Sequence, residues 1–377
     1  MYRRKKPRSR RQRSRSFGLA ATFVLAVAGN IAVAEAPPEE SVHSCDIAEL
    51  KLDDVIDAST QGCDPGGAML EITPGRQVTV PDLDTAVTYE AILPAGELNG
   101  PSNYQIAVGP TGEIAVRIDR HGLQKHTAEP AVIGSRAVFD RHFPQHLRGT
   151  ERPSGPEVSP MGTTDETCRS FPHSVLGHRW TGPYDYYFSL WRGPWASVGD
   201  IQPYIDANEQ MGLAGYAGKT PCTPNSSEWF PIFPLWTPDM KALTSVRPNQ
   251  TAAGVYDCGS RDDMSVHGLF VLADSTILAN ACTWSALGIA LEADIAYDME
   301  RHWYTGSGTC TTWSPGTPTY DFRSVALHEW GHTMGLGHVD DGRGQVMEEY
   351  MSHCETLRGW GLGDMNGLHS IYWPYWP

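Results

Sequence analysis

Residues 328–338 read HEWGHTMGLGH, and this stretch carries the strongest structural signal in the chain. His328 and His332 are four residues apart, so on a helix both imidazoles project from one face and can bind a single ion. Gly335 allows the left-handed turn that ends such a helix, because it has no Cβ to oppose a positive φ. The chain can then turn back and bring His338 to the same ion. The stretch therefore predicts a three-histidine metal site.

The residue after the first histidine predicts what this metal would do. Three protein ligands and an open fourth position are typical of catalytic zinc, whereas structural zinc has four protein ligands. Glu329 can reach a metal-bound water without being a ligand itself, accept a proton during attack, and donate it to a leaving amine. The pattern predicts peptide-bond hydrolysis with one catalytic Zn2+. A glutamate further along is the alternative third ligand, with Glu348, Glu349 and Glu355 as candidates.

The beginning of the chain has the composition of a secretory signal peptide. Nine of the 29 basic residues fall in the first 15 positions, and an uncharged, mostly apolar run follows from Phe17 to Ala34. This run ends in the small-residue pattern Ala32-Val33-Ala34, which predicts cleavage after Ala34. A membrane anchor is the alternative, but the run is near the lower limit for spanning a bilayer. We therefore expect a secreted, extracellular protein with no membrane association after cleavage.

The charge balance excludes some classes of partner. Without residues 1–34 the chain keeps 20 basic residues against 44 acidic ones, a net charge of −24. Such a surface repels nucleic acid and anionic membranes. With 40% hydrophobic and 19% charged residues, the 377-residue chain is neither disordered nor fibrous. We expect a globular monomer that acts on a protein or peptide substrate.

All eight cysteines follow Ala34, and an even number in an exported chain points to disulfides, four by default. Cys45 and Cys63 are expected to pair, because no other cysteine lies in the first part of the chain. The other six permit fifteen pairings.

Composition also divides the chain into parts. All twelve tryptophans lie between Trp180 and Trp376, and the segment Gly149–Glu166 is rich in Gly, Pro, Ser and Thr, as linkers are. We predict a signal peptide at 1–34, a small β-rich N-terminal accessory or pro-domain with its linker at 35–165, and a catalytic domain at 166–377.

Hydrophobic patterns predict strands in both parts. In the first part the expected strands are Gln77–Val80, Thr85–Leu93, and a hairpin of Tyr104–Val108 and Glu113–Ile118. In the second part they are Tyr184–Trp191, Val266–Leu272, Thr276–Cys282 and Ile289–Tyr297. Helices are expected at Val198–Met211 and after the N-cap Asp321.

The histidine stretch, with a methionine downstream, resembles the metzincin metallopeptidases, and within them the matrixin-like branch, over most of residues 170–373. Met347 looks like the methionine of the turn beneath the metal, with Met351 as the alternative. Leu291–Tyr304 resembles the strand before the loop to the active-site helix, and Leu362–Tyr372 resembles the C-terminal helix. The resemblance implies an α+β catalytic domain, preceded here by the small β-rich domain. Its twisted mixed sheet would have an antiparallel edge strand, with a long active-site helix and a C-terminal helix.

One strand of this fold would bind the substrate. Ile277–Ala281 (ILANA) resembles the edge strand along which matrixins bind an extended peptide. Exposed main-chain groups of such a strand pair with the substrate backbone. The resemblance thus implies that Leu278, Asn280 and Ala281 bind substrate.

The chain departs from the matrixin pattern at several positions. Asn280 and Ala296 stand where matrixins carry histidines for a second, structural zinc, so no such ion is expected. The Pro-Arg-Cys-Gly sequence that silences matrixins is absent, and Cys63 lies in Gln-Gly-Cys-Asp-Pro instead. Latency by another route stays open. Tyr350 lies three residues after Met347 rather than two, so we do not expect it to be a ligand.

Two further expectations concern calcium and a disulfide. Asp294 matches a matrixin residue that often helps to bind calcium, which makes Ca2+ a candidate cofactor, and solvated surface acids are the alternative. The further carboxylates that could contribute are Asp257, Asp262, Asp263 and Asp274. Cys282 with Cys310 is the preferred pair, since it would brace the strand and loop before the active-site helix.

These features predict a secreted zinc endopeptidase. The alternatives are an exported metal-containing binding protein without peptidase activity and a cell-wall peptide amidase. The intact Glu329 argues against a binding protein, because a pure binding module has no need for that carboxylate.

Overall fold

The computed structural model describes most of the chain from residue 42 to residue 372. The described ranges are 42–57, 60–96, 103–119, 131–144, 166–168, 172–190, 201–212, 222, 238–249, 258–272, 276–312, 315–339 and 344–372. The predicted signal peptide, most of the segment Gly149–Glu166, and two calcium candidates, Asp257 and Asp274, lie outside these ranges. Among the described residues, no helix has both the length and the apolar composition that crossing a lipid bilayer requires.

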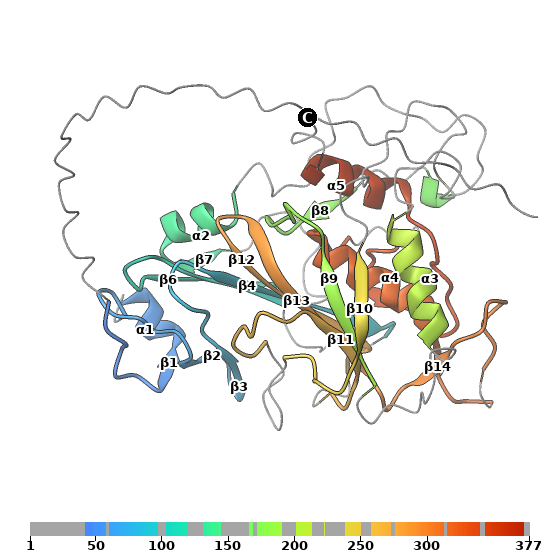
Figure 1. Cartoon of the computed structure of the whole chain (residues 1–377), viewed down its shortest axis with the longest axis horizontal. Helices are drawn as coiled ribbons and strands as arrows, with labels where there is room; N and C mark the ends of the chain where they lie inside the picture. Colours follow the sequence, from blue (N-terminus) through green and yellow to red (C-terminus); the bar gives the residue numbers. More distant parts are fainter. Residues whose placement is uncertain are drawn as a thin grey trace, which may run out of the picture. The chain divides into compact units, whose positions relative to one another are not determined.

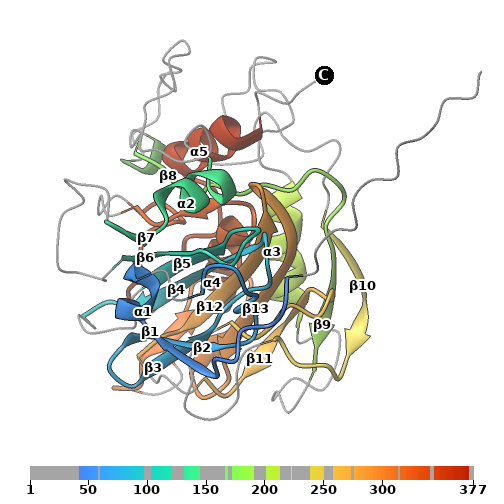
Figure 2. The same ribbon diagram turned by 90° about the vertical axis from the view of Figure 1, so that its left-hand side faces the viewer.

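A mixed sheet forms the centre of the molecule, in the order β10-β9-β11-β13-β12-β4-β5-β6-β7 (Figures 1 and 2). The strands from β10 to β13 are parallel, and those from β13 to β7 are antiparallel. A short strand, β17, pairs in parallel with β4. Their bounds are β4 Ala86–Pro94, β5 Asn103–Val108, β6 Ile114–Asp119, β7 Val132–Gly134, β9 Asp185–Ser189, β10 Asp239–Thr244, β11 Val266–Phe270, β12 Ala279–Ala286, β13 Ile289–Asp298 and β17 Tyr350–Met351.

The predicted strands are present in both parts of the sequence, and the expected hairpin is β5–β6. A separate N-terminal β-rich domain is not confirmed. Strands β4 to β7 extend the sheet of the C-terminal part, and residues 42–377 form one compact unit. Tryptophan content marks a change in composition, but it carries no information on which strands pair.

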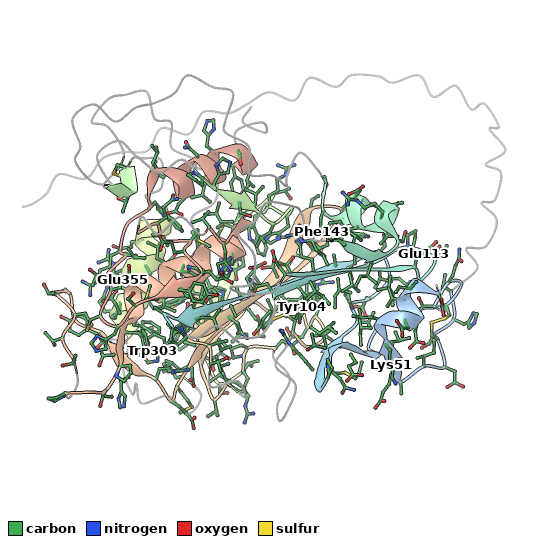
Figure 3. The ribbon with its side chains drawn as sticks, turned by 180° about the vertical axis from the view of Figure 1, so that it is seen from behind. Lys51, Tyr104, Glu113, Phe143, Trp303 and Glu355 are labelled. Atoms are coloured by element: carbon green, nitrogen blue, oxygen red, sulfur yellow. A yellow bond between two sulfur atoms is a disulfide. The ribbon has the colours of Figure 1, made fainter. Side chains whose placement is uncertain are left out.

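The rest of the N-terminal part packs beside this sheet. It consists of a three-stranded sheet and two short helices. The elements are β1 Glu49–Lys51, α1 Leu52–Ile56, β2 Met69–Thr73, β3 Arg76–Thr79 and α2 Arg136–His142. The buried guanidinium of Arg76 lies over the rings of Tyr89 and Tyr104, which stack at 5.1 Å. Tyr104 is labelled in Figure 3. This cation–π stack ties the small sheet to β4 and β5.

The helix of the histidine stretch is α4, Phe322–Thr333, and it is buried along its whole length except at Arg323. It lies between the sheet and α3, Gln202–Gly212, with α5, Leu362–Tyr372, nearby (Figure 1). The remaining short elements are η2 Glu166–Cys168, β8 Ser174–Val175, β14 His302–Tyr304, β15 Thr319–Asp321 and β16 Leu336–Gly337.

Four disulfides are present, as expected. They are Cys45–Cys63, Cys168–Cys222, Cys258–Cys282 and Cys310–Cys354. The pairing of Cys45 with Cys63 is confirmed, and the preferred pairing of Cys282 with Cys310 is wrong. Cys282 lies in the middle of β12 and is bonded to Cys258, which precedes β11. Cys310 is bonded to Cys354, which follows β17.

Candidate metal centre

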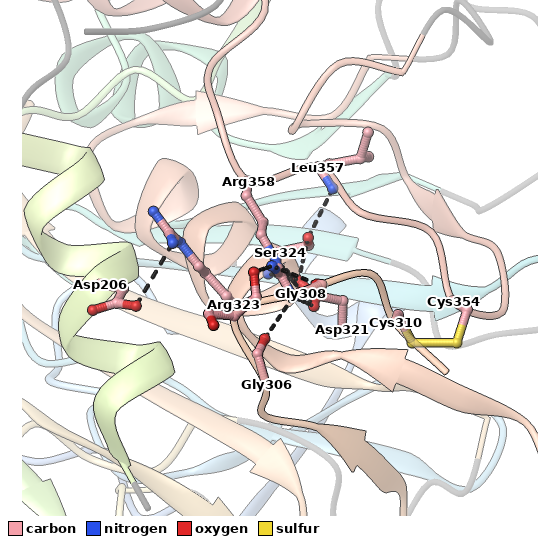
Figure 4. Close-up of polar contacts among 11 residues, drawn as sticks. Asp206, Gly306, Gly308, Cys310, Asp321, Arg323, Ser324, Cys354, Leu357 and Arg358 are labelled. Carbon is pink, nitrogen blue, oxygen red and sulfur yellow. Dashed lines mark hydrogen bonds and ion pairs between the residues drawn. A yellow bond between two sulfur atoms is a disulfide. The ribbon is translucent and has the colours of Figure 1, made fainter. Parts of the chain in front are cut away.

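The beginning of α4 is fixed by the predicted N-cap. The Asp321 carboxylate accepts hydrogen bonds from the Ser324 amide at 2.9 Å and the Ser324 hydroxyl at 2.6 Å. Arg358 donates to the same carboxylate and to the carbonyl oxygens of residues 306–308 (Figure 4). The Ser324 hydroxyl in turn accepts from the Leu357 amide at 2.7 Å. This network holds the first turn of the helix in place.

The end of α4 has the predicted left-handed turn. Gly335 has φ +98°, and a Cβ at this position would lie 2.3 Å from the His178 carbonyl oxygen. Only glycine fits there. The turn brings the three predicted ligands together, with Nε2–Nε2 distances of 2.9 Å for His328–His332, 3.0 Å for His332–His338 and 3.1 Å for His328–His338.

The other ring nitrogens fix the orientation of the histidines. His328 Nδ1 lies 2.7 Å from the Val346 carbonyl oxygen, and His332 Nδ1 lies 2.8 Å from the Leu336 carbonyl oxygen. Because a carbonyl only accepts, each Nδ1 carries the proton and each Nε2 presents a lone pair to the centre. Burial lowers the pKa of His328 to about 4, so the ring is neutral at pH 7.

Two residues of the N-terminal part contact the third histidine. His338 Nδ1 lies 3.3 Å from Glu90 Oε2 on β4 and 3.0 Å from Asn103 Nδ2 on β5. Donation from Nδ1 to the Glu90 carboxylate leaves Nε2 free for a metal, whereas a hydrogen bond from Asn103 Nδ2 requires an unprotonated Nδ1. Neither residue could be predicted, because Asn103 lies 235 positions before His338 and no sequence pattern links them.

Glu329 is fully buried next to the three histidines. Burial raises the pKa of its carboxyl well above the usual value, and the nearby Glu90 raises it further. Neither Glu329 oxygen has a hydrogen-bond partner among the described residues. A buried carboxylate without a hydrogen-bond partner destabilises the folded state unless a cation lies beside it. Three inward-facing imidazole nitrogens and this carboxylate therefore fit a zinc ion.

Met347, rather than Met351, lies against the active-site helix. A Cβ added to Gly331 would lie 2.2 Å from the Met347 sulfur, so the thioether fills the space next to this glycine. The buried Asp364 holds the turn by accepting the Val346 amide at 2.9 Å and the Met347 amide at 3.2 Å. Asp364 lies in the first turn of α5.

The predicted edge strand is not at an edge. Strand β12 pairs with β13 on one side and with β4 on the other, so Asn280 lies opposite both Ala296 and Ala91. The expectation that Ile277–Ala281 has a free edge is wrong for this structure, because the N-terminal strand β4 takes that position. That Leu278, Asn280 and Ala281 bind substrate stays a prediction.

Other predicted ligands lie apart from the histidines. Within the described ranges, the one group of three or more His, Cys, Asp or Glu side chains with metal-binding spacing is the histidine triad. Glu348 and Glu355 accept backbone amides of Gly344 and Ser352 instead. Both oxygens of the buried Asp294 likewise accept backbone amides, from Val266 and Asn249. Calcium binding stays a prediction.

Comparison with known proteins agrees with this geometry. Residues 269–373 match the family model of the matrixin peptidases. Metalloendoproteinase 1 of Glycine max is 37% identical over 78 residues, which cover 20% of this chain and 24% of that protein. Matrix metalloproteinase-23 of Homo sapiens is 36% identical over 81 residues, 21% of this chain and 19% of that protein. The chain thus aligns with less than a quarter of either relative. The match of residues 269–373 to the matrixin model agrees with the sequence resemblance.

Proposed function

We propose that this protein is a secreted zinc endopeptidase in which Glu329 is the general base. The observation that carries the proposal is the convergence of three Nε2 atoms within 3.1 Å of one another, beside a buried carboxylate that has no hydrogen-bond partner among the described residues. Zinc, when bound, supplies a Lewis acid that lowers the pKa of water and polarises a carbonyl. The match to the matrixin model supports this class of reaction.

The protein's own residues would divide the work as follows. His328, His332 and His338 would hold the ion, with their rings oriented by backbone carbonyls and by Glu90. The Glu329 carboxylate would accept a proton from water and return it to the leaving amine. A nearby cation lowers the pKa that burial raises, so the ion would keep this carboxylate ready to accept the proton. Met347 would support the helix between the ligands.

Further proposals concern the location of the protein, its oligomeric state and the beginning of its catalytic unit. Four disulfides are consistent with an extracellular protein, and the acidic chain would act as a monomer on proteins or peptides. The catalytic unit would begin near residue 166, after the predicted linker.

The test is hydrolysis of casein and a quenched peptide library by the zinc-loaded protein, with and without a chelator. Glu329→Gln should lower kcat by about 10²- to 10⁴-fold while zinc stays bound. Glu300→Gln is the matched control, because Glu300 is exposed on the turn after β13. Full activity in the Glu329 variant would refute the mechanism. Cleavage of cell-wall peptides but not proteins in a parallel digest would favour an amidase.

A further inference from the structure

The end of strand β4 runs between two backbone segments of the region that matches the matrixin model. On one side it pairs antiparallel with β12, and the Leu278 amide donates to the Ile92 carbonyl at 2.9 Å. On the other side it pairs in parallel with β17, where the Leu93 amide donates to the Glu349 carbonyl at 3.1 Å. The Ala95 amide continues this pairing to the Met351 carbonyl at 2.8 Å. Residues 91–95 thus have hydrogen bonds to this region on both sides.

These hydrogen bonds are the ones that an extended peptide would need. Under the proposed function, a substrate pairs with the backbone of Leu278–Ala281 and lies across the metal centre. The edge of β12 that would receive the peptide is already used by β4. A peptide cannot pair with the same amide and carbonyl groups while β4 is in place.

The side chains of β4 also leave no space for a second chain. Ile92 is fully buried, and it is the one residue of the described N-terminal part in the hydrophobic cluster that contains Trp330 and Met347. Its neighbours Ala91 and Leu93 are fully buried in the cluster on the opposite side of the sheet. The side chains of β4 are therefore packed on both faces of the sheet, in addition to the hydrogen bonds along both of its backbone edges.

The same strand reaches the metal ligands. Glu90, the residue before Ala91, contacts His338 Nδ1 at 3.3 Å. Asn103 holds both features together, because its Oδ1 accepts the Ala91 amide at 3.1 Å and its Nδ2 lies 3.0 Å from His338 Nδ1. Strand β4 thus contacts one of the proposed ligands on its Nδ1 side and is held there by Asn103.

We propose that residues 91–95 are an internal occupant of the peptide-binding groove, so that the full-length chain is a latent form of the endopeptidase. The inference rests on the proposed function for the meaning of the groove. A covalently attached strand competes at an effective concentration on the order of millimolar, so a micromolar peptide cannot displace it. Release of β4 from β12 and β17 is then the step that activates the enzyme. Latency here needs no cysteine, in contrast to the matrixin pattern that this sequence lacks.

The test uses the full chain with a site for a specific protease inserted in Gly149–Glu166. The zinc-loaded protein is measured before and after cutting and separation of the fragments, by hydrolysis of a quenched peptide. Amide hydrogen exchange of residues 277–286 and 349–351 is followed by mass spectrometry in the same samples. Cutting should raise kcat/KM by about tenfold or more, and the amides of Leu278 and its neighbours should lose protection together with this gain.

A variant of the uncut chain provides a second measurement. Leu93→Pro removes the amide that donates to Glu349 and should raise kcat/KM several-fold without any cut. Val132→Pro is the matched control, because it lies at the first position of β7, the outer strand at the other end of the β4–β7 segment, where proline is tolerated. It should leave both the rate and the exchange of residues 277–286 unchanged.

The outcomes separate this inference from the proposed function. An uncut chain that hydrolyses the peptide as fast as the cut chain, with exchange unchanged on cutting, would show that β4 is a permanent part of the sheet and would overturn the inference. Loss of protection on cutting without hydrolysis by any form would support the internal occupant and refute the peptidase. No change in exchange together with no activity would overturn both.

Discussion

The two halves of the metal centre come from different distances along the chain. The ligands, Glu329, Met347 and the capping residues all lie between residues 321 and 364, whereas Glu90 and Asn103 come from the first third of the sequence. The near half builds the site from helix, turn and cap signals that are local. The distant half contacts His338 from β4 and β5, which strand pairing brings to the site.

The near half should therefore determine whether the metal centre forms, and the distant half should determine access to it. A change in the near half should destroy metal binding or the fold around it in any form of the protein. A change in the distant half should leave the centre assembled and alter access or affinity. The predictions below compare the two halves in order of decreasing effect.

His332→Ala removes a ligand of the near half. With two imidazoles left, the protein should lose its zinc at micromolar metal, and kcat/KM of the cut chain should fall by at least about 10³-fold. Elemental analysis and peptide hydrolysis measure these two effects. His302→Ala, at an exposed position on β14, is the control and should keep both. Stoichiometric zinc in the His332 variant would contradict the assigned ligand set.

Asp364→Ala breaks the hydrogen bonds that hold the methionine turn. The carboxylate accepts the amides of Gly361, Val346 and Met347, all buried. Leaving these donors unsatisfied should lower the free energy of unfolding by about 3 to 4 kcal/mol. Urea denaturation measures this loss. Asp364→Asn keeps one acceptor oxygen and should lose less than half as much, and an equal loss in both variants would argue that charge rather than hydrogen bonding matters.

The near half of the site could be predicted from the sequence because its signals are local. The N-cap at Asp321, the turn at Gly335 and the spacing of His328, His332 and His338 each depend on a few neighbouring residues. Strand existence was also predictable, from β4 to β13. The partner of β12 was not, because pairing between residues almost 200 positions apart depends on packing and leaves no short pattern. The disulfide error at Cys282 has the same origin.

A buried histidine behind the near half predicts a pH effect. His178 Nε2 donates to the His332 carbonyl oxygen at 3.2 Å, and burial lowers the pKa of His178 to about 4, from 6.5. Since the unfolded chain binds the proton first, stability should fall as pH falls from about 6.5 toward 4, by about 1.4 kcal/mol per pH unit in that window. From pH 7 to pH 5 the loss is about 2 kcal/mol. His178→Gln should reduce the slope of the stability profile between pH 6.5 and pH 4 by this share, while His328 and His267, whose pKa values burial also lowers, keep the rest of it. A profile as steep as in the wild type would contradict this cause.

Gly331→Ala tests the contact between α4 and the methionine turn. The new Cβ would lie 2.2 Å from the Met347 sulfur, so the turn must shift, at a cost of about 1.5 kcal/mol. Thermal unfolding measures this cost. The same substitution at Gly182, where nothing lies within 4 Å of the added Cβ, should change stability by less than about 0.5 kcal/mol. Equal effects at both positions would mean that backbone propensity and not the Met347 contact decides the result.

Glu90→Gln tests the distant half with the smallest expected effect. The glutamine keeps the size of the side chain on β4 but is a weaker acceptor for His338 Nδ1, which lies 3.3 Å away. Removing such an outer partner typically lowers zinc affinity by about tenfold, far less than losing a ligand. Competition with a fluorescent chelator measures the dissociation constant in the uncut chain. Because Glu90 leaves the groove together with β4, the same substitution should have no effect on zinc affinity once the fragments are cut and separated. If the cut sample still showed a tenfold loss, the N-terminal fragment that carries Glu90 would still be bound at the metal centre. The distant half would then not be released by cutting.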